Sequence, residues 1–259
     1  SPISHSLSPL LHNTAYAQIG LSASYEAIEV KAHSLAKFVD ERDASWTGFS
    51  LTMPLKEEAI SYAKHVDDLA LRINSANTLY RKAGEWYATS TDVIGFKNAL
   101  EMHKVEIKGH VVILGAGATA RAAAAACDSS QTQITVINRS LARVQAMSDA
   151  VIESELSFLN WDDLSVLADA DLVISTAPAG VTDSIELPAK TLAPYFEALY
   201  KPWPTPASAM WASRGGKVID GLDLLIHQAL AQIAIFSGET FDSALMYTKL
   251  REVGLAALK

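Results

Sequence analysis

The sequence predicts an α/β protein of two domains, the second of which is built on a doubly wound parallel sheet. Two observations lead to this prediction. Short apolar runs alternate with helical stretches along most of the chain, and in the second half these runs are almost continuously apolar, as strands covered on both faces should be. The length of 259 residues, 49% of them hydrophobic, suits one large domain or two modest ones.

In the first half, helices and strands are expected to alternate over short connections. The first helix should use Ser8 as its N-cap and Pro9 as its first residue, and should end before Gly20. Residues 82–84 predict a turn between two strands. The further helices expected here cover 33–42 and about 57–64, and the expected strands cover 25–30, 47–52, 76–81 and 85–89.

The second half alternates strands with helical stretches in the manner of a doubly wound parallel sheet. We place the domain boundary after Asp92, near the start of a helix expected over 93–104. The helical stretches after Gly221 could complete the second domain or return to the first, and periodicity alone does not decide between these. The strands expected in this half cover 111–115, 134–138, 171–176, 195–200 and 217–220.

Composition argues against several classes of partner. The formal net charge of −8 and the lack of a Lys or Arg run argue against nucleic acid and against an anionic membrane surface. The longest apolar stretch, near 223–236, is interrupted by His227, Gln228 and Gln232, and it is shorter than the roughly 20 residues that a bilayer span needs. We therefore expect no nucleic acid and no membrane as partners.

Cysteine and histidine usage gives two further expectations. Cys127 is the only cysteine, so no intrachain disulfide can form and a reducing, cytoplasmic location is expected. The seven histidines and this cysteine show no metal-ligand spacing, so we expect no metal. The chain starts with Ser1 and Pro2 and has no signal-peptide pattern, which suggests a processed or truncated start.

A glycine-rich turn joins the strand expected at 111–115 to an alanine-rich helical stretch. In its pattern G-x-G-x-x-A, Gly115 permits a tight turn, Gly117 lets the backbone approach a pyrophosphate at a helix N-terminus, and Ala120 keeps helix and strand close. This context predicts a Rossmann-like dinucleotide site, and the alternative is a turn that serves packing alone. The cofactor-binding residues expected here are Gly115, Ala116, Gly117, Ala118, Thr119 and Ala120.

The residues after the next strand favour NADP over NAD. An NAD site usually has Asp or Glu here for the ribose 2′-hydroxyl, whereas this chain has Asn138, Arg139 and Ser140, with Arg143 one helical turn further on. A guanidinium attracts the dianionic 2′-phosphate of NADP and can bond it bidentately. The alternative is that Asn138 caps the following helix and both arginines are merely solvated.

A lysine stands where a strand gives way to a helix. Pro54 is expected to end the strand that carries Ser50 and Thr52, whose hydroxyls should point the same way. Lys56 then opens the next helix, where a positive charge opposes the helix dipole, although the two glutamates that follow can compensate. The position points to a functional lysine, and the alternative is an ordinary exposed lysine in a loop.

Five further polar motifs accompany the glycine turn. They are SHSLSP at 4–9, SLTMPLK at 50–56, SANT at 75–78, STDVIG at 90–95 and GLDLLIHQ at 221–228. All six occur in the order found in shikimate dehydrogenases, and the chain resembles that family over nearly its whole length. The resemblance implies a substrate-binding domain of residues 1–92 plus 222–259, to which the last helices return, and an NADP-binding Rossmann domain of residues 93–221.

The resemblance also implies roles for particular residues. Lys56 and Asp92 match the catalytic lysine and the aspartate of the catalytic dyad. Ser50 and Ser90 stand where the family usually has asparagine, and His5 is expected to be structural. The implied substrate-binding residues are Ser6, Ser8, Ser50, Thr52, Asn77, Tyr200 and Gln228, and Thr176, Ala177 and Gly221 complete the predicted cofactor site.

The reaction implied by the resemblance is the reversible NADPH-dependent reduction of 3-dehydroshikimate to shikimate, a step toward chorismate and the aromatic amino acids. Lys56 would deliver the proton and Asp92 would hold it in place. Two alternatives stay open: an NAD-using quinate/shikimate dehydrogenase, and a non-catalytic nucleotide-sensing regulator on the same fold. The expected partners are the small-molecule substrate and cofactor, and the chain is expected to be a monomer or a homodimer.

Overall fold

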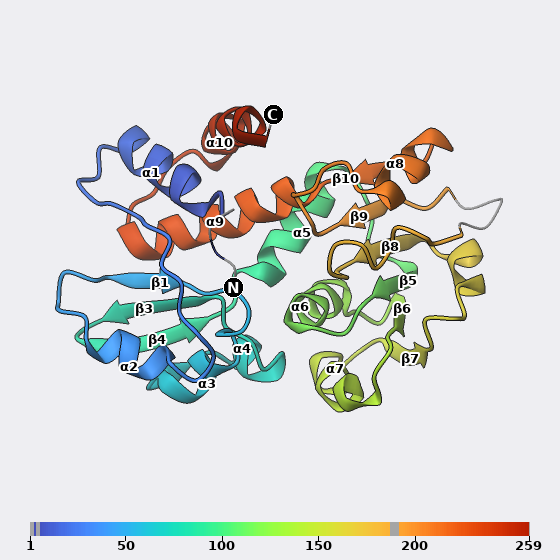
Figure 1. Ribbon diagram of the computed structural model, residues 1–259, viewed down its shortest axis with the longest axis horizontal. Coiled ribbons are helices and arrows are strands. Elements are labelled where there is room, and N and C mark those ends of the chain that lie inside the picture. The colour runs from blue at the N-terminus through green and yellow to red at the C-terminus, as the bar shows by residue number, and fades with distance from the viewer. Residues whose placement is uncertain (1–2, 4–5, 187–191, 259) are drawn as a thin grey trace. The chain divides into compact units, whose positions relative to one another are not determined.

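The chain forms two compact units (Figure 1). Unit 1 comprises Ser1–Gly95 and Ile226–Lys259, and unit 2 comprises Phe96–Leu225. The boundaries expected from the sequence, after Asp92 and after Gly221, each lie slightly earlier in the chain. The computed structural model describes residues 3, 6–186 and 192–258; His5, expected to be structural, lies outside these residues.

Unit 1 contains a four-stranded sheet in the order β1-β3-β4-β2. Strand β3 pairs antiparallel with β1 and with β4, and β2 pairs parallel with β4. Ala83 and Gly84, with φ of 51° and 82°, form the predicted tight turn between β3 and β4, since both central positions of such a turn need positive φ. The elements are α1 (Ser8–Gln18), α2 (Leu35–Asp40), β1 (Gly48–Ser50), α3 (Glu58–Tyr62), β2 (His65–Val66), α4 (Asp68–Arg72), β3 (Thr78–Lys82), β4 (Glu85–Thr89) and α10 (Ser243–Leu258).

The two faces of the unit 1 sheet have different neighbours. Figure 1 shows α2 and α3 on one side and α1 and α10 on the other. Phe49 of β1 belongs to the hydrophobic core shared with α2 and α3. The alternate residue Gly48 faces α9 (Gly221–Ser237), because a Cβ added to it would lie 2.4 Å from the ring of Phe236. Strand alternation thus directs one face of β1 to the core and the other to α9.

The strand predicted over 25–30 does not form. This segment has no ladder partner among the described residues, and it runs as irregular backbone. The side chain of Asn13 instead bonds both backbone polar groups of Tyr25, accepting from the N–H and donating to the C=O, each at 2.8 Å. An alternating apolar pattern predicts a strand only where a second strand is available to pair with it.

The first helix ends as predicted but begins differently. Gly20 lies just past α1 with φ of 70°, as a helix-terminating glycine should. Ser8 is the first helical residue rather than the N-cap, a position that Leu7 occupies without a side-chain cap. The hydroxyl of Ser6 accepts the N–H of Ser8 at 3.2 Å, so one free N–H group of the first helical turn is satisfied by the serine two residues earlier.

Unit 2 contains a six-stranded sheet in the order β10-β9-β8-β5-β6-β7, and every neighbouring pair is parallel. The strand order proceeds outward from β5 in both directions, which creates a switch point at the carboxyl ends of β5 and β8. The predicted α/β class with a doubly wound parallel sheet is confirmed. The elements are α5 (Asp92–Met102), which begins in unit 1, then β5 (Gly109–Leu114), α6 (Ala118–Cys127), β6 (Thr132–Ile137), η1 (Leu141–Arg143), α7 (Val144–Ala150), β7 (Glu155–Leu159), η2 (Ser165–Asp169), β8 (Leu172–Ser175), β9 (Tyr195–Glu197), α8 (Pro206–Ser213) and β10 (Val218–Ile219).

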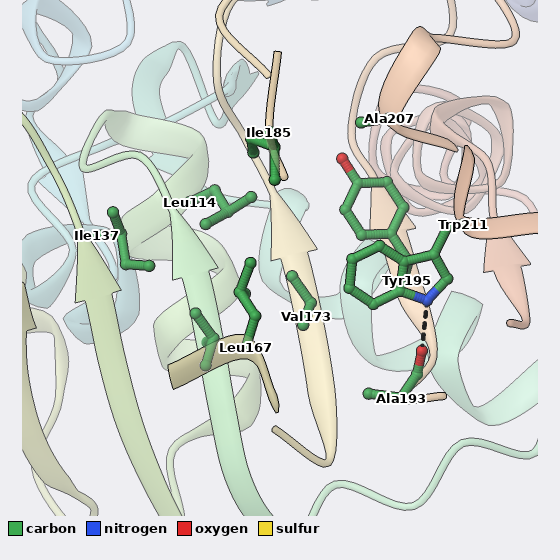
Figure 2. Packing of buried hydrophobic residues seen from close by; sticks show 10 residues of the cluster. Leu114, Ile137, Leu167, Val173, Ile185, Ala193, Tyr195, Ala207 and Trp211 are labelled. Atoms are coloured by element: carbon green, nitrogen blue, oxygen red, sulfur yellow. Dashed lines mark hydrogen bonds between the residues drawn. The ribbon is translucent and has the colours of Figure 1, made fainter. Parts of the chain in front are cut away.

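Figure 2 shows the hydrophobic core on one face of this sheet. The rings of Tyr195 and Trp211 stack with their centroids 4.7 Å apart, and the indole N–H of Trp211 donates to the C=O of Ala193 at 2.7 Å. Leu114 and Val173, from β5 and β8, pack in the same cluster. This packing holds α8 against β8 and β9 on that face of the sheet.

Three findings concern membranes, metals and thiol chemistry in the part of the chain that the structure describes. None of its helices combines the length and the apolar character needed to cross a membrane. No three His, Cys, Asp or Glu side chains gather in it as a metal site would require. Cys127 is buried, and burial raises the pKa of its thiol to about 12, so the thiolate that reacts or binds metal is suppressed.

Candidate active site and cofactor site

The structure brings Lys56 and Asp92 together in unit 1. Lys56 lies just before α3, and Asp92 is the first residue of α5, where a carboxylate is favoured by the helix dipole. The Lys56 Nζ donates to Asp92 Oδ2 at 2.6 Å, and the two side chains are 13% and 9% exposed. A charged hydrogen bond of this length, largely removed from water, is strong. Lys56 is therefore not the exposed loop lysine of the alternative interpretation.

Asn77 holds the other side of the aspartate. Its Nδ2 donates to Asp92 Oδ1 at 2.8 Å and also lies 3.2 Å from Gln228 Oε1. Its Oδ1 accepts the backbone N–H of Thr91 and the hydroxyl of Thr78, both at 2.8 Å. The carboxamide orientation is thus fixed by its neighbours, and both carboxylate oxygens of Asp92 carry a donor. Residues far apart in the sequence meet here.

A second group of polar side chains contains Ser8, Tyr25 and Ser50. Burial raises the pKa of the Tyr25 phenol, and hydrogen bonds with Ser50 and with Ser8 offset part of that rise. The Tyr25 ring stacks on His12 with centroids 4.1 Å apart. His12 has no exposed surface, and burial lowers its pKa to about 3, against which an interaction with the Gln232 side chain acts. The imidazole is therefore neutral at ordinary pH, and the group is a cluster of hydroxyls without a cation.

Two side chains of this region were missed by the sequence analysis. Gln232 is 1% exposed, and its Oε1 accepts the Ser50 hydroxyl at 2.8 Å. The signal that could have found it is its position four residues after Gln228, which places both amides on one face of a helix. Tyr25 lies in the segment wrongly predicted as a strand, where no local pattern indicates that its hydroxyl meets two serines.

The positions of Thr52, Ser90 and Tyr200 say less about their roles. Thr52 lies beyond the end of β1, which stops at Ser50, and it is exposed. Ser90 is buried beside the Thr91–Asp92 pair. Tyr200 is half-buried in unit 2, in the loop that follows β9. No contact in the described residues assigns these three side chains a ligand.

The predicted glycine turn follows β5 at the switch point of unit 2. Gly115 has φ of 109°, and a Cβ added to it would lie 2.8 Å from the Thr176 hydroxyl, which itself donates to the C=O of Leu114 at 3.0 Å. Gly117 has ordinary extended backbone as the N-cap residue of α6, and a Cβ there would meet only the Arg143 guanidinium, at 3.4 Å. Gly115 is thus required by the fold, whereas Gly117 leaves open space beside a cation.

The remaining cofactor-site predictions fall around this turn. Ala120 is fully buried, and Ala116 and Ala177 are nearly so. A Cβ on Gly221, the first residue of α9, would lie 2.3 Å from the C=O of Ala198, so close packing within unit 2 explains this glycine. Ala118 and Thr119 form the first turn of α6, whose free N–H groups suit an anion.

The residues after β6 show how Asn138 is used. Its Nδ2 donates to the C=O of Ser140 at 2.6 Å, and α7 begins at Val144 without a side-chain cap. Asn138 is therefore not the helix cap of the alternative interpretation. Arg139 and Arg143 are both exposed, and no carboxylate takes the position at which NAD sites usually have one. The donor set fits a phosphate group.

A parallel sheet with a glycine turn at its switch point, together with a buried amine–carboxylate pair in a separate α/β unit, is typical of two-domain dehydrogenases that use a dinucleotide. Comparison with protein families gives two matches. The model described as "Shikimate dehydrogenase substrate binding domain" matches residues 1–79, and the model described as "Shikimate / quinate 5-dehydrogenase" matches residues 99–182.

Individual relatives agree with these matches. The shikimate dehydrogenase (NADP(+)) of Thermosynechococcus vestitus is 34% identical over 96% of this chain and 92% of that protein. The crystal structure of the Mycobacterium tuberculosis shikimate dehydrogenase has a TM-score of 0.86 and 34% identity over 96% of each chain. That of the Thermus thermophilus enzyme, in complex with NADP(H) and shikimate, has a TM-score of 0.85 and 29% identity over 97% of this chain and 96% of that one. The chain belongs to the shikimate dehydrogenase family, as its motifs predict.

Proposed function

We propose that this chain catalyses the reversible NADPH-dependent reduction of 3-dehydroshikimate to shikimate. Membership of the shikimate dehydrogenase family supports this, as do relatives named for NADP(+) and a similar structure in complex with NADP(H) and shikimate. The observation that carries the proposal is the largely buried bond between Lys56 and Asp92. A regulatory protein that only senses a nucleotide has no need of an amine and an acid held in this way.

The two units have separate roles in this proposal. Unit 1 binds the substrate and carries the proton-transfer pair, and unit 2 binds NADP. The family match to a substrate-binding domain lies within unit 1, and the second family match lies within unit 2. The division of labour follows the predicted domains of residues 1–92 plus 222–259 and residues 93–221.

Hydroxyl and amide groups bind the substrate in unit 1. Ser6 and Ser8 provide hydroxyl donors for the substrate carboxylate, and Ser50, whose hydrogen points to Gln232, provides a lone pair for a substrate hydroxyl. Ser8 and Ser50 also interact with the Tyr25 hydroxyl, which we add to this group. Asn77 and Gln228 provide amides for the ring hydroxyls. Thr52 of unit 1 and Tyr200 of unit 2 complete the predicted substrate-binding set. A neutral, hydroxyl-rich site suits a small polyhydroxy acid.

Lys56 and Asp92 handle the proton. In the reductive direction the Lys56 ammonium donates a proton to the substrate's carbonyl oxygen, and in the oxidative direction the neutral amine accepts it back. Asp92 receives hydrogen bonds from Lys56 and Asn77 on its two oxygens, so it fixes the amine in place. When bound, NADPH supplies the hydride that the carbonyl carbon accepts.

The cofactor residues fit NADP in two places. The turn of Gly115, Ala116, Gly117, Ala118, Thr119 and Ala120 would receive the pyrophosphate, because Gly117 leaves its backbone open and α6 begins there. Arg139 and Arg143 would bind the 2′-phosphate beside Asn138 and Ser140. Thr176, Ala177 and Gly221 would complete the cofactor site.

The direct test is the reduction of NADP by shikimate, followed by the absorbance of NADPH. We expect kcat/KM for shikimate oxidation with NADP to exceed that with NAD by at least about tenfold, since a pair of charged contacts to the 2′-phosphate is worth that much or more. Preference for NAD or quinate would support the NAD-using quinate/shikimate dehydrogenase instead. No turnover with any of the four combinations would support the non-catalytic regulator.

We propose that the protein acts in the cytoplasm, and its single, buried cysteine supports this location. The partners proposed are the small-molecule substrate and cofactor alone. Sedimentation equilibrium would distinguish the monomer from the homodimer, and the proposal is compatible with either.

A further inference from the structure

Gln232 lies in the interior of unit 1, one helical turn after Gln228 on α9. Its side chain is 1% exposed, and the strand it faces is β1, where Gly48 allows close approach of the helix. A buried amide must satisfy one acceptor and two donor hydrogens to avoid a cost in stability. The partners it finds are therefore informative.

Three hydrogen bonds connect this amide to residues of the candidate active site. Its Oε1 accepts the hydroxyl of Ser50 at 2.8 Å, and its Nε2 donates to Thr78 Oγ1 at 3.0 Å and to the C=O of Asn77 at 3.2 Å. These three partners fix which end of the amide is oxygen and which is nitrogen, because Ser50 donates and the Asn77 carbonyl can only accept.

The bonds form one directional series that ends at Asp92. Ser50 donates to Gln232, Gln232 donates to Thr78, Thr78 donates to Asn77 Oδ1 at 2.8 Å, and Asn77 donates to Asp92 Oδ1 at 2.8 Å. Each donor polarises the next in such a series. The carboxylate at the end of the series is the one that holds Lys56.

The series also fixes where the hydrogen of the Ser50 hydroxyl points. A hydroxyl has one hydrogen, and that of Ser50 points to Gln232. The Gln232 amide therefore orients the hydroxyl of Ser50 as well as the carboxamide of Asn77.

We propose that Gln232 is a positioning residue that couples the hydroxyl cluster of Ser8, Tyr25 and Ser50 to the Lys56–Asp92 pair. It touches neither the reacting carbon nor the cofactor; it acts through Ser50 on the substrate side and through Thr78 and Asn77 on the proton-transfer side. This inference rests on the proposed function, because the coupling is read out through shikimate turnover.

The first test is Gln232→Met, which keeps the volume and removes the three bonds together with the interaction with His12. We expect the KM for shikimate to rise and kcat to fall, each by roughly threefold to tenfold, while the KM for NADP stays unchanged. A residue needed only for folding would reduce the active fraction and the melting temperature but leave the KM for shikimate unchanged. That result would overturn the inference.

A double-mutant cycle isolates the coupling. Ser50→Ala and Gln232→Met remove the two ends of one bond, so the second change should cost far less in the background of the first than it does alone. Effects on kcat/KM that multiply would show that the two side chains act independently. Ser237→Ala is the matched control on α9, because its hydroxyl bonds only within and just after the helix; its kinetics should equal those of the unchanged protein.

If the Gln232→Met variant does not fold, Gln232→Glu provides a second test. A protonated carboxyl can still donate to Thr78 and accept from Ser50, whereas an ionised one repels the Asn77 carbonyl. The KM for shikimate, divided by that of the unchanged protein at each pH, should therefore fall toward one as the pH is lowered. The titratable groups that face this position are His12 and Tyr25. Because a carboxylate here would raise the pKa of the His12 imidazole, the same ratio is also measured in the His12→Phe background, where it should still fall toward one.

A flat ratio would contradict the positioning role. An unchanged protein that does not reduce NADP with shikimate would instead refute the proposed function, and this inference with it.

Discussion

The two candidate sites are built in opposite ways. In unit 1 the groups are side chains that come from α1, β1, β3, α5 and α9 and bond one another, as the series from Ser50 to Asp92 shows. In unit 2 the site is a short local turn that offers mainly backbone groups, with Gly115 and Gly117 at its centre. The first kind should be damaged by losing a single polar atom, and the second by gaining a single methyl group.

A buried histidine in unit 1 and a buried glutamate in unit 2 have pKa values that burial shifts in opposite directions. His12 in unit 1 is fully buried, with its pKa lowered to about 3. Glu197 in unit 2 is fully buried as well, and burial raises its pKa, although hydroxyls of Tyr195 and Thr205 donate to it. In each unit, burial disfavours the charged form.

The largest effect should come from the end of the series in unit 1. Asp92→Asn removes the charge that faces Lys56 while keeping the shape, and we expect kcat to fall by about 10² to 10⁴, the usual worth of positioned proton transfer. Steady-state kinetics of shikimate oxidation measure it. Asp40→Asn, an exposed partner of Tyr62 in the same unit, should leave kcat unchanged. A kcat for Asp92→Asn within about threefold of that of the unchanged protein would show that the Lys56–Asp92 pair has no part in proton transfer.

The next effect concerns the cations of unit 2. Arg139→Gln with Arg143→Gln should reduce the preference for NADP over NAD by roughly tenfold to a hundredfold, because charged contacts to the 2′-phosphate are lost. The ratio of kcat/KM for the two cofactors measures the preference. Lys108→Gln, an exposed change in the same unit, serves as the control. An unaltered ratio in the double variant would assign the 2′-phosphate to other residues.

A smaller effect separates the two glycines of the turn. Gly117→Ala should raise the KM for NADP by about tenfold and leave the melting temperature unchanged, since the added methyl group meets no backbone. Gly115→Ala should lower the melting temperature, because φ of 109° and the nearby Thr176 hydroxyl both oppose a side chain. If Gly117→Ala left the KM for NADP unchanged, the turn would serve packing alone.

The last effect is on stability as a function of pH. The unfolded chain protonates His12 near pH 6.5 and the folded chain only near pH 3, so the free energy of unfolding should fall as the pH falls through this window. The contribution is at most about 1.4 kcal/mol per pH unit. His12→Phe should flatten that part of the curve measured by urea unfolding.

Glu197 should contribute the opposite slope. Its folded pKa lies above the ordinary value of 4.5, so its contribution to stability is present at lower pH and is lost as the pH rises through the folded pKa. Glu197→Gln should remove this loss. A pair of variants that both changed the slope in the same direction would contradict the contrast between the units.

The difference between the sites also explains how much of each could be predicted from the sequence. The glycine turn and the parallel strands of unit 2 are local: a continuous apolar run predicts β5, and the residues that follow it are those of the turn. Strand β7 was missed, because its residues are only partly buried and give no such run. Short elements such as β2, α4 and α8 were not predicted either.

Unit 1 could be predicted less well, because its contacts join distant residues. Ser50 and Gln232 are 182 positions apart, and no periodicity relates them. Lys56, Asp92 and Asn77 were found by resemblance to a family, whereas Tyr25 and Gln232 were not found at all. The wrong strand at 25–30 has the same origin, since pairing depends on a partner that local pattern does not reveal.

The central claim is that Lys56 exchanges the proton with the substrate's oxygen. Lys56→Ala tests it most directly, with Lys64→Ala, an exposed lysine of the same unit, as control. We predict that kcat for shikimate oxidation falls by about 10² to 10⁴ while the KM for NADP is unchanged and Lys64→Ala retains full turnover. Turnover by Lys56→Ala within a few-fold of the unchanged protein, with the same affinity for shikimate, would contradict the account.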